Sequence, residues 1–262
     1  MCGIVGFAGR EQAAPILLDG LERLEYRGYD SAGIAVLSES AGLQVKKSKG
    51  RLKVLSAMVD GGKSVDGFIG VGHTRWATHG EPNYINSHPH TSEQGKIALV
   101  HNGIIENYVE IKDFLISRGV HFCSDTDTEV VAQLLEYYYL ISGDLLGSVY
   151  KVLDRIEGAY ALGILCADMP DSFIAARKDA PLLLGYGEGC NFIASDVTAI
   201  IKHTRDISYM DDGEVAVVTA DEIHVFDALG QPVEKQHSYV DWDVSAAEKG
   251  GYAHFMFKEI ME

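Results

Sequence analysis

The order of apolar patterns along the chain constrains its fold most: strand-like runs come first, three helical segments follow, and strand-like runs return. In the first part of the chain, runs rich in Val, Ile and Ala predict strands over 3–8, 32–37, 68–74 and 96–102. A helix is expected over 14–28, because Leu17, Leu21 and Leu24 recur at helical spacing. Gly28 is expected to cap its C-terminal end.

Three amphipathic helices are predicted in the middle of the chain, each ending at a glycine: 107–119, 128–143 and 145–158. The last third predicts strands over 159–166, 172–177, 181–187, 191–195, 214–220 and 222–227. The final two are expected to form a hairpin closed at Ala220 and Asp221. Because strands and helices are segregated, the pattern predicts an α+β fold with two stacked, mainly antiparallel sheets and helices on the outside.

The whole chain, 1–262, is expected to form one domain. No repeat, low-complexity tract or Pro/Ser-rich linker divides it, and 47% apolar residues suffice for a substantial core. The segment 251–262 has helical phasing but no cap or stop signal, so the natural chain is expected to continue beyond Glu262.

Charge and cysteine content disfavour several classes of protein. With 22 basic and 38 acidic residues, the net charge of -16 argues against a nucleic-acid or anionic membrane partner. Neither a signal-peptide pattern nor a membrane-length apolar stretch is present, so a cytoplasmic location is expected. The four cysteines, Cys2, Cys123, Cys166 and Cys190, form no C-x-x-C pair, which argues against zinc and disulfides.

Three motifs resemble ligand sites but lack the required context. Residues 57–64 match a relaxed phosphate-loop pattern, yet a helix-like segment precedes them and a strand-like segment follows, the reverse of a phosphate loop. Residues 124–130 resemble a calcium loop without its glycine and distal glutamate. Four histidines lie within 73–90, but their spacing is not that of metal ligands, so neither a metal nor another cofactor is expected.

Two dipeptides are candidates for substrate contacts. Arg75 lies just past a predicted strand end, where it is suited to hold a carboxylate with Trp76 as a wall, although a surface arginine and a core tryptophan fit equally well. Asn102 and Gly103 form a strong hairpin signal, but an amphipathic helix follows where a second strand is required. The alternative interpretation is functional: the Asn102 side-chain amide and the Gly103 N–H are suited to donate hydrogen bonds to a developing oxyanion.

Asp127 completes this candidate set. Thr126 and Glu129 have the spacing of a capping box for the following helix, which leaves the Asp127 carboxylate available for an ammonium group. An arginine for a carboxylate and an aspartate for an ammonium suit the zwitterion of a free amino acid. Oxyanion donors near a thiol suit acyl transfer.

Cys2 follows Met1 directly and precedes the first predicted strand. Its residue type favours a small buried hydrophobe, like the other cysteines. Its position also allows an N-terminal nucleophile, exposed once Met1 is removed.

These motifs occur together in one known family. The stretches "MCGIVG", "LEYRGYDSAG", "HTRWATHGEP", "HPH", "VHNGIIEN", "SDTDTEV" and "KGGYAHFMFKEI" have the order and form seen in the glutaminase domain of glutamine-fructose-6-phosphate aminotransferases. The resemblance runs from Cys2 to the last residue. It implies an N-terminal nucleophile hydrolase fold, a four-layer αββα sandwich, and a type-2 glutamine amidotransferase domain that is joined to a sugar-phosphate isomerase domain in a longer chain.

The resemblance also implies catalytic roles. Cys2 resembles the nucleophile, and its own α-amino group, freed by removal of Met1, resembles the general base. Asn102 and Gly103 resemble the oxyanion hole. Arg27 resembles a residue that orients the N-terminus.

Substrate-binding roles follow in the same way. Arg75 and Asp127 resemble the clamp on the carboxylate and ammonium of glutamine. Thr78 and His79 resemble part of the loop that closes over the substrate, and Trp76 resembles the ammonia gate.

The implied reaction is hydrolysis of the side-chain amide of L-glutamine to glutamate and ammonia through a thioester at Cys2. In the longer, homo-oligomeric enzyme the ammonia aminates fructose 6-phosphate to give glucosamine 6-phosphate. Two other hypotheses stay open: a glutamine-binding module without chemistry, and an amidotransferase with a different ammonia acceptor, as in amidophosphoribosyltransferase.

Overall fold

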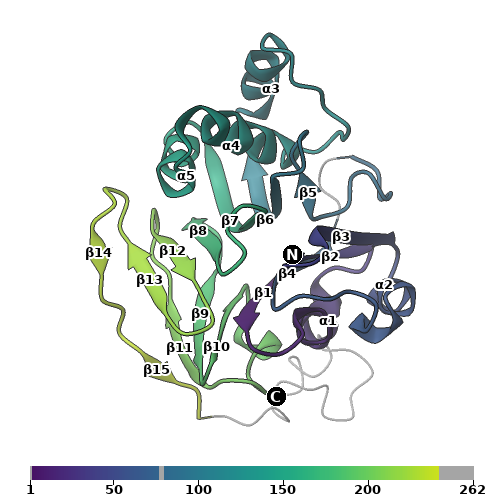
Figure 1. Ribbon diagram of the computed structural model, residues 1–262, viewed down its shortest axis with the longest axis vertical. Coiled ribbons are helices and arrows are strands. Elements are labelled where there is room, and N and C mark those ends of the chain that lie inside the picture. The colour runs from purple at the N-terminus through teal and green to yellow at the C-terminus, as the bar shows by residue number, and fades with distance from the viewer. Residues whose placement is uncertain (1, 77–79, 242–262) are drawn as a thin grey trace, which may run out of the picture.

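Two antiparallel β-sheets are stacked face to face in the computed structural model, which describes residues 2–76 and 80–241 except for the side chain of Arg27 (Figure 1). The eight-stranded sheet has the order β15 (Ser238–Tyr239), β11 (Asp206–Tyr209), β9 (Leu183–Gly187), β10 (Cys190–Ala194), β1 (Gly3–Gly9), β4 (Ile69–Arg75), β2 (Ser31–Ser38) and β3 (Gly42–Lys49). The seven-stranded sheet has the order β14 (Pro232–Val233), β13 (Ile223–Phe226), β12 (Val215–Val218), β8 (Phe173–Lys178), β7 (Gly158–Cys166), β6 (Ile97–Ile105) and β5 (His90–Thr91).

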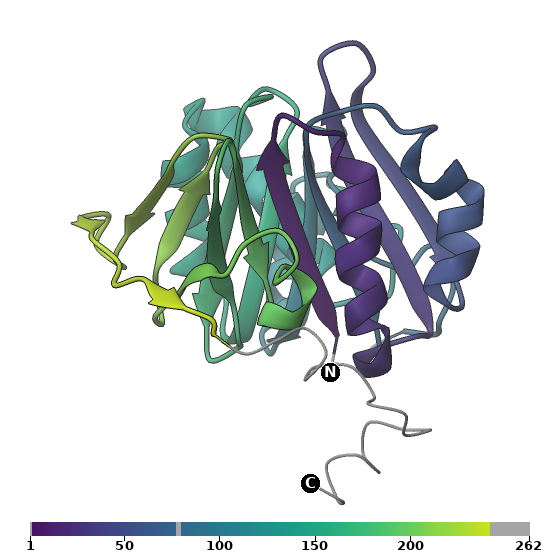
Figure 2. The same ribbon diagram turned by 90° about the horizontal axis from the view of Figure 1, so that it is seen from below.

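Helices form the two outer layers. Helices α1 (Ala13–Leu24) and α2 (Leu52–Met58) cover the eight-stranded sheet, and Figure 2 shows α1 lying along β1. Helices α4 (Glu129–Ser142) and α5 (Leu145–Leu153) cover the seven-stranded sheet, and α3 (Tyr108–Ile116) packs on α4. The predicted α+β fold and its four-layer αββα arrangement are confirmed.

Strand β1 explains why the buried strands are apolar without alternation. Ile4 and Ala8 enter the core between the sheets, whereas Val5 and Phe7 enter the core beneath α1. Because both faces of an inner strand are covered, each successive side chain is buried, and the period-2 pattern of a half-exposed strand disappears.

The helix boundaries differ from the sequence-based expectation at two glycines. The first helix ends at Leu24 and continues as a short 3-10 turn at Glu25–Arg27. Gly28 has an extended φ of -165° and so is not a left-handed cap. A Cβ there would lie 2.8 Å from the carbonyl carbon of Arg75, so close backbone packing requires glycine. Gly158 begins β7 instead of ending α5, which stops at Leu153.

Other local predictions agree with the structure. Gly143 caps α4 with a left-handed φ of 69°, and β12 and β13 form the predicted hairpin around Ala220 and Asp221. Strand β3 was not predicted, because it is an edge strand with lysines at its exposed positions. The segment 251–262 lies outside the described residues.

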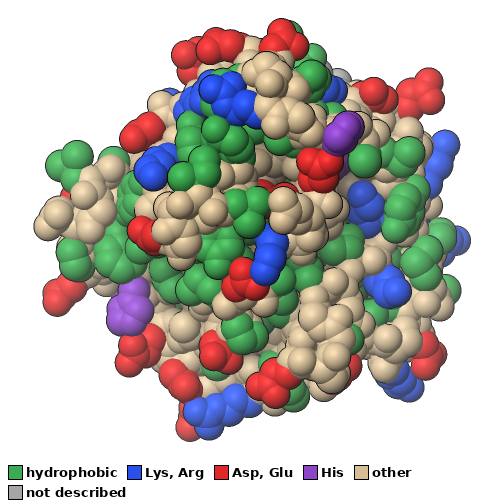
Figure 3. All heavy atoms as spheres, turned by 45° about the horizontal axis from the view of Figure 1, so that its top comes forward, with side chains coloured by type: hydrophobic (Ala, Val, Ile, Leu, Met, Phe, Trp, Pro, Cys, Tyr) green, Lys and Arg blue, Asp and Glu red, His purple; other side chains and the backbone are tan. Residues whose placement is uncertain are grey.

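The surface has no single-sign patch on the face drawn in Figure 3, where described acidic side chains lie between scattered lysines and arginines. No helix among the described residues is long and apolar enough to cross a membrane.

Candidate active site

Cys2 is brought to the end of β4 by strand pairing. Strands β1 and β4 are antiparallel, with Gly3 opposite Thr74, so the residue before β1 meets the residues that end β4. The Trp76 N–H donates to Cys2 Sγ over 3.2 Å, and the thiol lies 3.6 Å from Trp76 O. The sulfur is therefore held between the N–H and C=O groups of one residue.

The environment of Cys2 keeps its sulfur in the thiol form. Burial raises the pKa of the Cys2 thiol, and the Trp76 N–H opposes this only in part. Since the thiolate is the reactive species, a nucleophilic Cys2 requires a base that removes its proton.

Asn102 approaches Cys2 from the other sheet. It lies on β6, and its Nδ2 donates to the Cys2 carbonyl oxygen over 3.0 Å. A side-chain amide carries two N–H donors, and the second has no partner among the described residues. This amide thus holds Cys2 with one hydrogen and has another available.

Gly103 offers a backbone donor on the open edge of β6. The bonds from Glu106 N to Glu157 O and from Ala167 N to Lys96 O show that even-numbered residues of β6 bond to β7. The N–H of Gly103 therefore points to the opposite edge, beyond the end of the short strand β5, and has no partner in the described part of the chain.

The neighbouring N–H groups on this edge are occupied. The His101 N–H donates to His88 Nδ1 over 3.2 Å, and the Ile105 N–H donates to Asp127 Oδ2 over 2.8 Å. The available Gly103 N–H thus lies between the N–H groups of His101 and Ile105, which both have acceptors. The bond from Ile105 also orients the Asp127 carboxylate.

Gly103 must be a glycine at this position. Its φ of 134° lies in a region that other residues rarely adopt, and a Cβ would lie 2.0 Å from Ala159 O. The Asn-Gly pair lies inside β6 instead of forming a hairpin turn, because the strand continues to Ile105 and pairs with β7 throughout.

Arg75 ends β4 and is 4% exposed. Its Nη2 donates to Gly80 O over 3.2 Å, so the guanidinium is held by the main chain five residues after Arg75. Asp127 is likewise 4% exposed, and it places a carboxylate in the same cavity as this guanidinium. A buried cation and anion in one small cavity suit a zwitterionic ligand.

These elements surround a cavity of about 400 Å³, a size suited to a small molecule. Six of the residues predicted from the sequence line it: Cys2, Arg75, Trp76, Asn102, Gly103 and Asp127. Thr78 and His79 lie outside the described residues. Arg27 lies in the 3-10 turn, and its side chain is not described.

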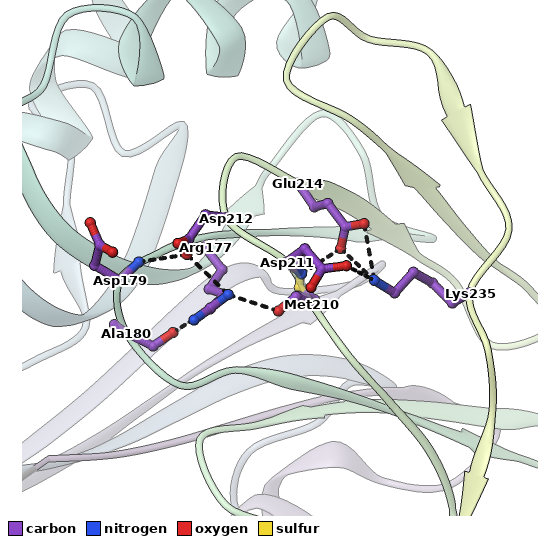
Figure 4. Close-up of polar contacts among 8 residues, drawn as sticks. All are labelled: Arg177, Asp179, Ala180, Met210, Asp211, Asp212, Glu214 and Lys235. Atoms are coloured by element: carbon purple, nitrogen blue, oxygen red, sulfur yellow. Dashed lines mark hydrogen bonds and ion pairs between the residues drawn. The ribbon is translucent and has the colours of Figure 1, made fainter.

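One wall of the cavity comes from the loop between β8 and β9. Asp179, Ala180 and Pro181 line the cavity there, and Asp179 has a left-handed φ of 56°. Arg177 fixes this loop, because its Nε donates to Ala180 O over 2.7 Å and its Nη1 contacts Asp212 Oδ1 at 3.0 Å (Figure 4).

Asp212 also accepts from the Asp179 N–H over 2.7 Å, and Figure 4 shows the Asp179 carboxylate pointing away from this network. Beside it, Lys235 Nζ bonds Asp211 at 2.8 Å and Glu214 at 3.0 Å. The Arg177–Asp212 ion pair therefore braces the loop that forms the wall, and Lys235 braces the neighbouring turn that carries Asp212.

Comparison with known proteins identifies the family. Residues 74–202 match the family that is described as glutamine amidotransferase domain. The glutamine–fructose-6-phosphate aminotransferase (isomerizing) of Caldanaerobacter subterraneus subsp. tengcongensis is 59% identical over 262 residues, which cover 100% of this chain and 42% of that protein. The chain contains a glutamine amidotransferase domain.

Other comparisons agree. The protein of the same name from Methanosarcina acetivorans is 50% identical to this amidotransferase domain over 271 residues, covering 100% of the chain and 43% of that protein. The chain thus spans about two fifths of the length of these curated relatives.

Solved structures share the four-layer fold of N-terminal nucleophile amidotransferases. The glutamine phosphoribosylpyrophosphate amidotransferase of B. subtilis superposes with a TM-score of 0.75 and 27% identity, covering 87% of this chain and 49% of its own. A glutamine aminotransferase class-II domain protein from Silicibacter pomeroyi shares the fold, with a TM-score of 0.57 and 14% identity.

The amidotransferase domain places several residues in the cavity that the sequence analysis did not select. They are His88, His101, Ile104, Thr126, Thr128, Ala159, Asp179, Ala180 and Pro181. Five of them, His88, His101, Ile104, Thr126 and Thr128, lie within the quoted motifs "HPH", "VHNGIIEN" and "SDTDTEV". The others reach the cavity through strand pairing and loop packing, which local patterns do not report.

Four histidines, His73, His88, His90 and His101, are buried next to the cavity. Burial lowers the pKa of His73 to about 3 and also lowers the pKa values of the other three, so all four are neutral at physiological pH. No group of metal-binding side chains occurs among the described residues. The rings of His73 and His88 instead stack on each other, with their centroids 4.1 Å apart.

Half of the capping box predicted for Thr126 and Glu129 forms in this domain. The Glu129 N–H donates to Thr126 Oγ1 over 3.4 Å as predicted, and Thr128, which directly precedes the helix, makes no side-chain cap bond. The Glu129 carboxylate accepts from the Cys123 and Ser124 N–H groups instead of the Thr126 N–H. It thereby closes the turn that leads to Asp127.

Proposed function

We propose that this chain is the glutaminase half of a glutamine–fructose-6-phosphate aminotransferase. The observation that carries the proposal is the convergence of Cys2, two available oxyanion donors and an Arg75–Asp127 pair in one cavity. The 59% identity across the whole chain supports the assignment of the family's reaction.

Glutamine binds with its α-carboxylate at Arg75 and its α-ammonium at Asp127. Both partners are buried, so each hydrogen bond is charge-assisted and little screened by water. The side-chain amide then extends toward Cys2.

Cys2 Sγ attacks the amide carbon after its proton passes to the α-amino group of Cys2, which is free once Met1 is removed. An α-amine titrates near 8 and is therefore partly neutral at physiological pH. The resulting oxyanion accepts hydrogen bonds from Asn102 Nδ2 and Gly103 N.

The tetrahedral intermediate collapses by breaking its C–N bond, and the proton held by the α-amine completes the leaving ammonia. A Cys2 thioester remains, and water attacks it with the same amine as base. Glutamate leaves, and the thiol regains its proton.

The remaining assignments extend this proposal. Residues 1–262 form the amidotransferase domain, and a sugar-phosphate isomerase domain in a longer, homo-oligomeric and cytoplasmic chain uses the ammonia to convert fructose 6-phosphate to glucosamine 6-phosphate. Trp76, which contacts Cys2 and lines the cavity, gates the ammonia. Thr78 and His79 close over glutamine, and Arg27 orients the N-terminus.

Ammonia release from glutamine tests the proposal, with wild-type protein compared with Cys2→Ala. We expect turnover by the wild type, none by the variant, and labelling of Cys2 by an electrophilic glutamine analogue. Intact mass establishes that Met1 is absent from the sample. Glutamine binding without turnover in the processed wild type would instead indicate a binding module.

The ammonia acceptor needs the longer chain. Glucosamine 6-phosphate formed from glutamine and fructose 6-phosphate is the expected product. Amination of phosphoribosyl pyrophosphate would contradict the proposed acceptor and leave the glutaminase assignment intact.

A further inference from the structure

His73 connects the two sheets beside the active site without lining the cavity. It lies on β4 and is 1% exposed. Its Nε2 lies 3.0 Å from Asn102 Oδ1 and 3.1 Å from His101 O. This side chain therefore contacts the residue that holds Cys2 but does not reach the substrate.

The contacts determine which ring nitrogen of His73 carries the proton. The His101 carbonyl oxygen can only accept, so Nε2 must donate. The other nitrogen, Nδ1, is buried with no hydrogen-bond partner in the described part of the chain, and a buried N–H is rarely left there. Burial lowers the pKa of His73 to about 3, so the neutral ring holds one proton, on Nε2.

That proton sets the orientation of the Asn102 amide. Oδ1 faces the His73 N–H, and Nδ2 faces the Cys2 carbonyl oxygen. A 180° rotation of the amide would bring two N–H groups together at His73 and two oxygens together at Cys2. Both ends of the amide thus select the same orientation.

We infer that His73 is a positioning residue, whose Nε2–H holds Asn102 in the orientation that directs its second N–H to the oxyanion of the tetrahedral intermediate. This inference rests on the proposed function. Without the His73 donor, Asn102 Oδ1 loses its partner, and the rotated amide presents an oxygen to the oxyanion. Arg75 and Asp127 bind ground-state glutamine independently of this contact.

The test compares His73→Met, which has no donor, with His73→Gln, which has similar length and keeps an N–H near the position of Nε2. Loss of one oxyanion donor lowers kcat about 10²–10³-fold, so a donor that is only misoriented should lower it about 10–100-fold. We expect that loss in His73→Met, a KM within about twofold of wild type, and recovery of most of kcat in His73→Gln.

A double-mutant cycle identifies the residue through which His73 acts. Asn102→Ala combined with His73→Met should lose no more kcat than Asn102→Ala alone, because both changes remove the same donor. His203, an exposed residue that stacks on Phe192 outside the cavity, serves as the control. His203→Gln should leave kcat and KM unchanged.

The outcomes separate the two proposals. Losses that add in the double mutant, a raised KM with unchanged kcat, or wild-type kcat in His73→Met would overturn the role of His73 alone. Absence of ammonia release by processed wild-type protein would overturn the proposed function, and this inference with it.

A measurement on the unaltered protein covers the case in which His73→Met does not fold. Nitrogen-15 NMR of the histidine rings should show His73 as the Nε2–H tautomer at neutral pH. An Nδ1–H tautomer would contradict the inference.

Discussion

The main-chain N–H of Trp76 lies 3.2 Å from the sulfur of Cys2, across 74 positions of sequence. This contact aligns the thiol with the end of β4, where Arg75 enters the cavity. Since burial raises the pKa of the thiol, the contact supplies orientation, and the proton must go to a separate base.

An uncleaved extension in front of Cys2 should abolish ammonia release. It converts the α-amine into a peptide nitrogen, which cannot take the thiol proton, and a general base contributes about 10²–10⁴-fold to rate. Glutamate binding should persist, because Arg75 and Asp127 are unaffected. Ammonia release, intact mass and calorimetric titration with glutamate check this. Full turnover by a chain that retains the extension would exclude the α-amine as the base.

Gly28→Ala should impair catalysis although residue 28 does not line the cavity. Its Cβ would lie 2.8 Å from Arg75 C and 3.1 Å from Trp76 N, and these main-chain atoms align Cys2. A misplacement of about 1 Å can cost 10²-fold, so we expect kcat/KM to fall at least about tenfold. Gly147→Ala, where the atoms nearest the new Cβ belong to the Asp144 side chain, is the control and should change kcat/KM less than about twofold.

Asp127→Asn should weaken recognition of the α-ammonium while keeping an acceptor for the Ile105 N–H. A hydrogen bond to a charged group contributes about 1.5–3 kcal/mol, so KM for glutamine should rise about 10–100-fold. Glutaramate, which lacks the ammonium, should be a poor substrate for the wild type and nearly as good as glutamine for the variant. The exposed Asp125 is the control. If Asp125→Asn raised KM equally, general charge loss would explain the effect.

The buried histidines should make the protein sensitive to mild acid. Unfolded histidines bind protons below about pH 6.5, whereas burial lowers the pKa of His73 to about 3 and those of His88, His90 and His101 below their ordinary value. The unfolded state then binds more protons, so the free energy of unfolding falls as pH drops from about 6.5, by at most about 1.4 kcal/mol per pH unit for each of these histidines.

Urea unfolding between pH 4.5 and 7 measures this slope above the main carboxylate range. His90→Gln should reduce the slope by about one proton. Leu99→Ala, which alters the β6 residue paired with His90, should lower the free energy of unfolding at every pH without changing the slope. A slope equal to that of the wild type in His90→Gln would exclude His90 as a source of the slope.

Much of the fold was predictable because its signals are local. Apolar runs marked the inner strands, helical spacing marked α1, α4 and α5, and Gly143 and the turn at Ala220 and Asp221 were correctly assigned. The edge strand β3 escaped prediction, because a strand that is half exposed and rich in lysine lacks the apolar run by which strands are recognised.

By itself, the sequence determined which residue types were available for the site: a cysteine behind Met1, an Asn-Gly pair, and a separated arginine and aspartate. Tertiary structure decided how they meet. Asn102 reaches Cys2 across 100 positions, the Gly103 N–H is available only because β5 ends beside it, and Gly28 and His73 matter through contacts with other strands. Such relations depend on strand order and register between distant segments, which no local pattern encodes.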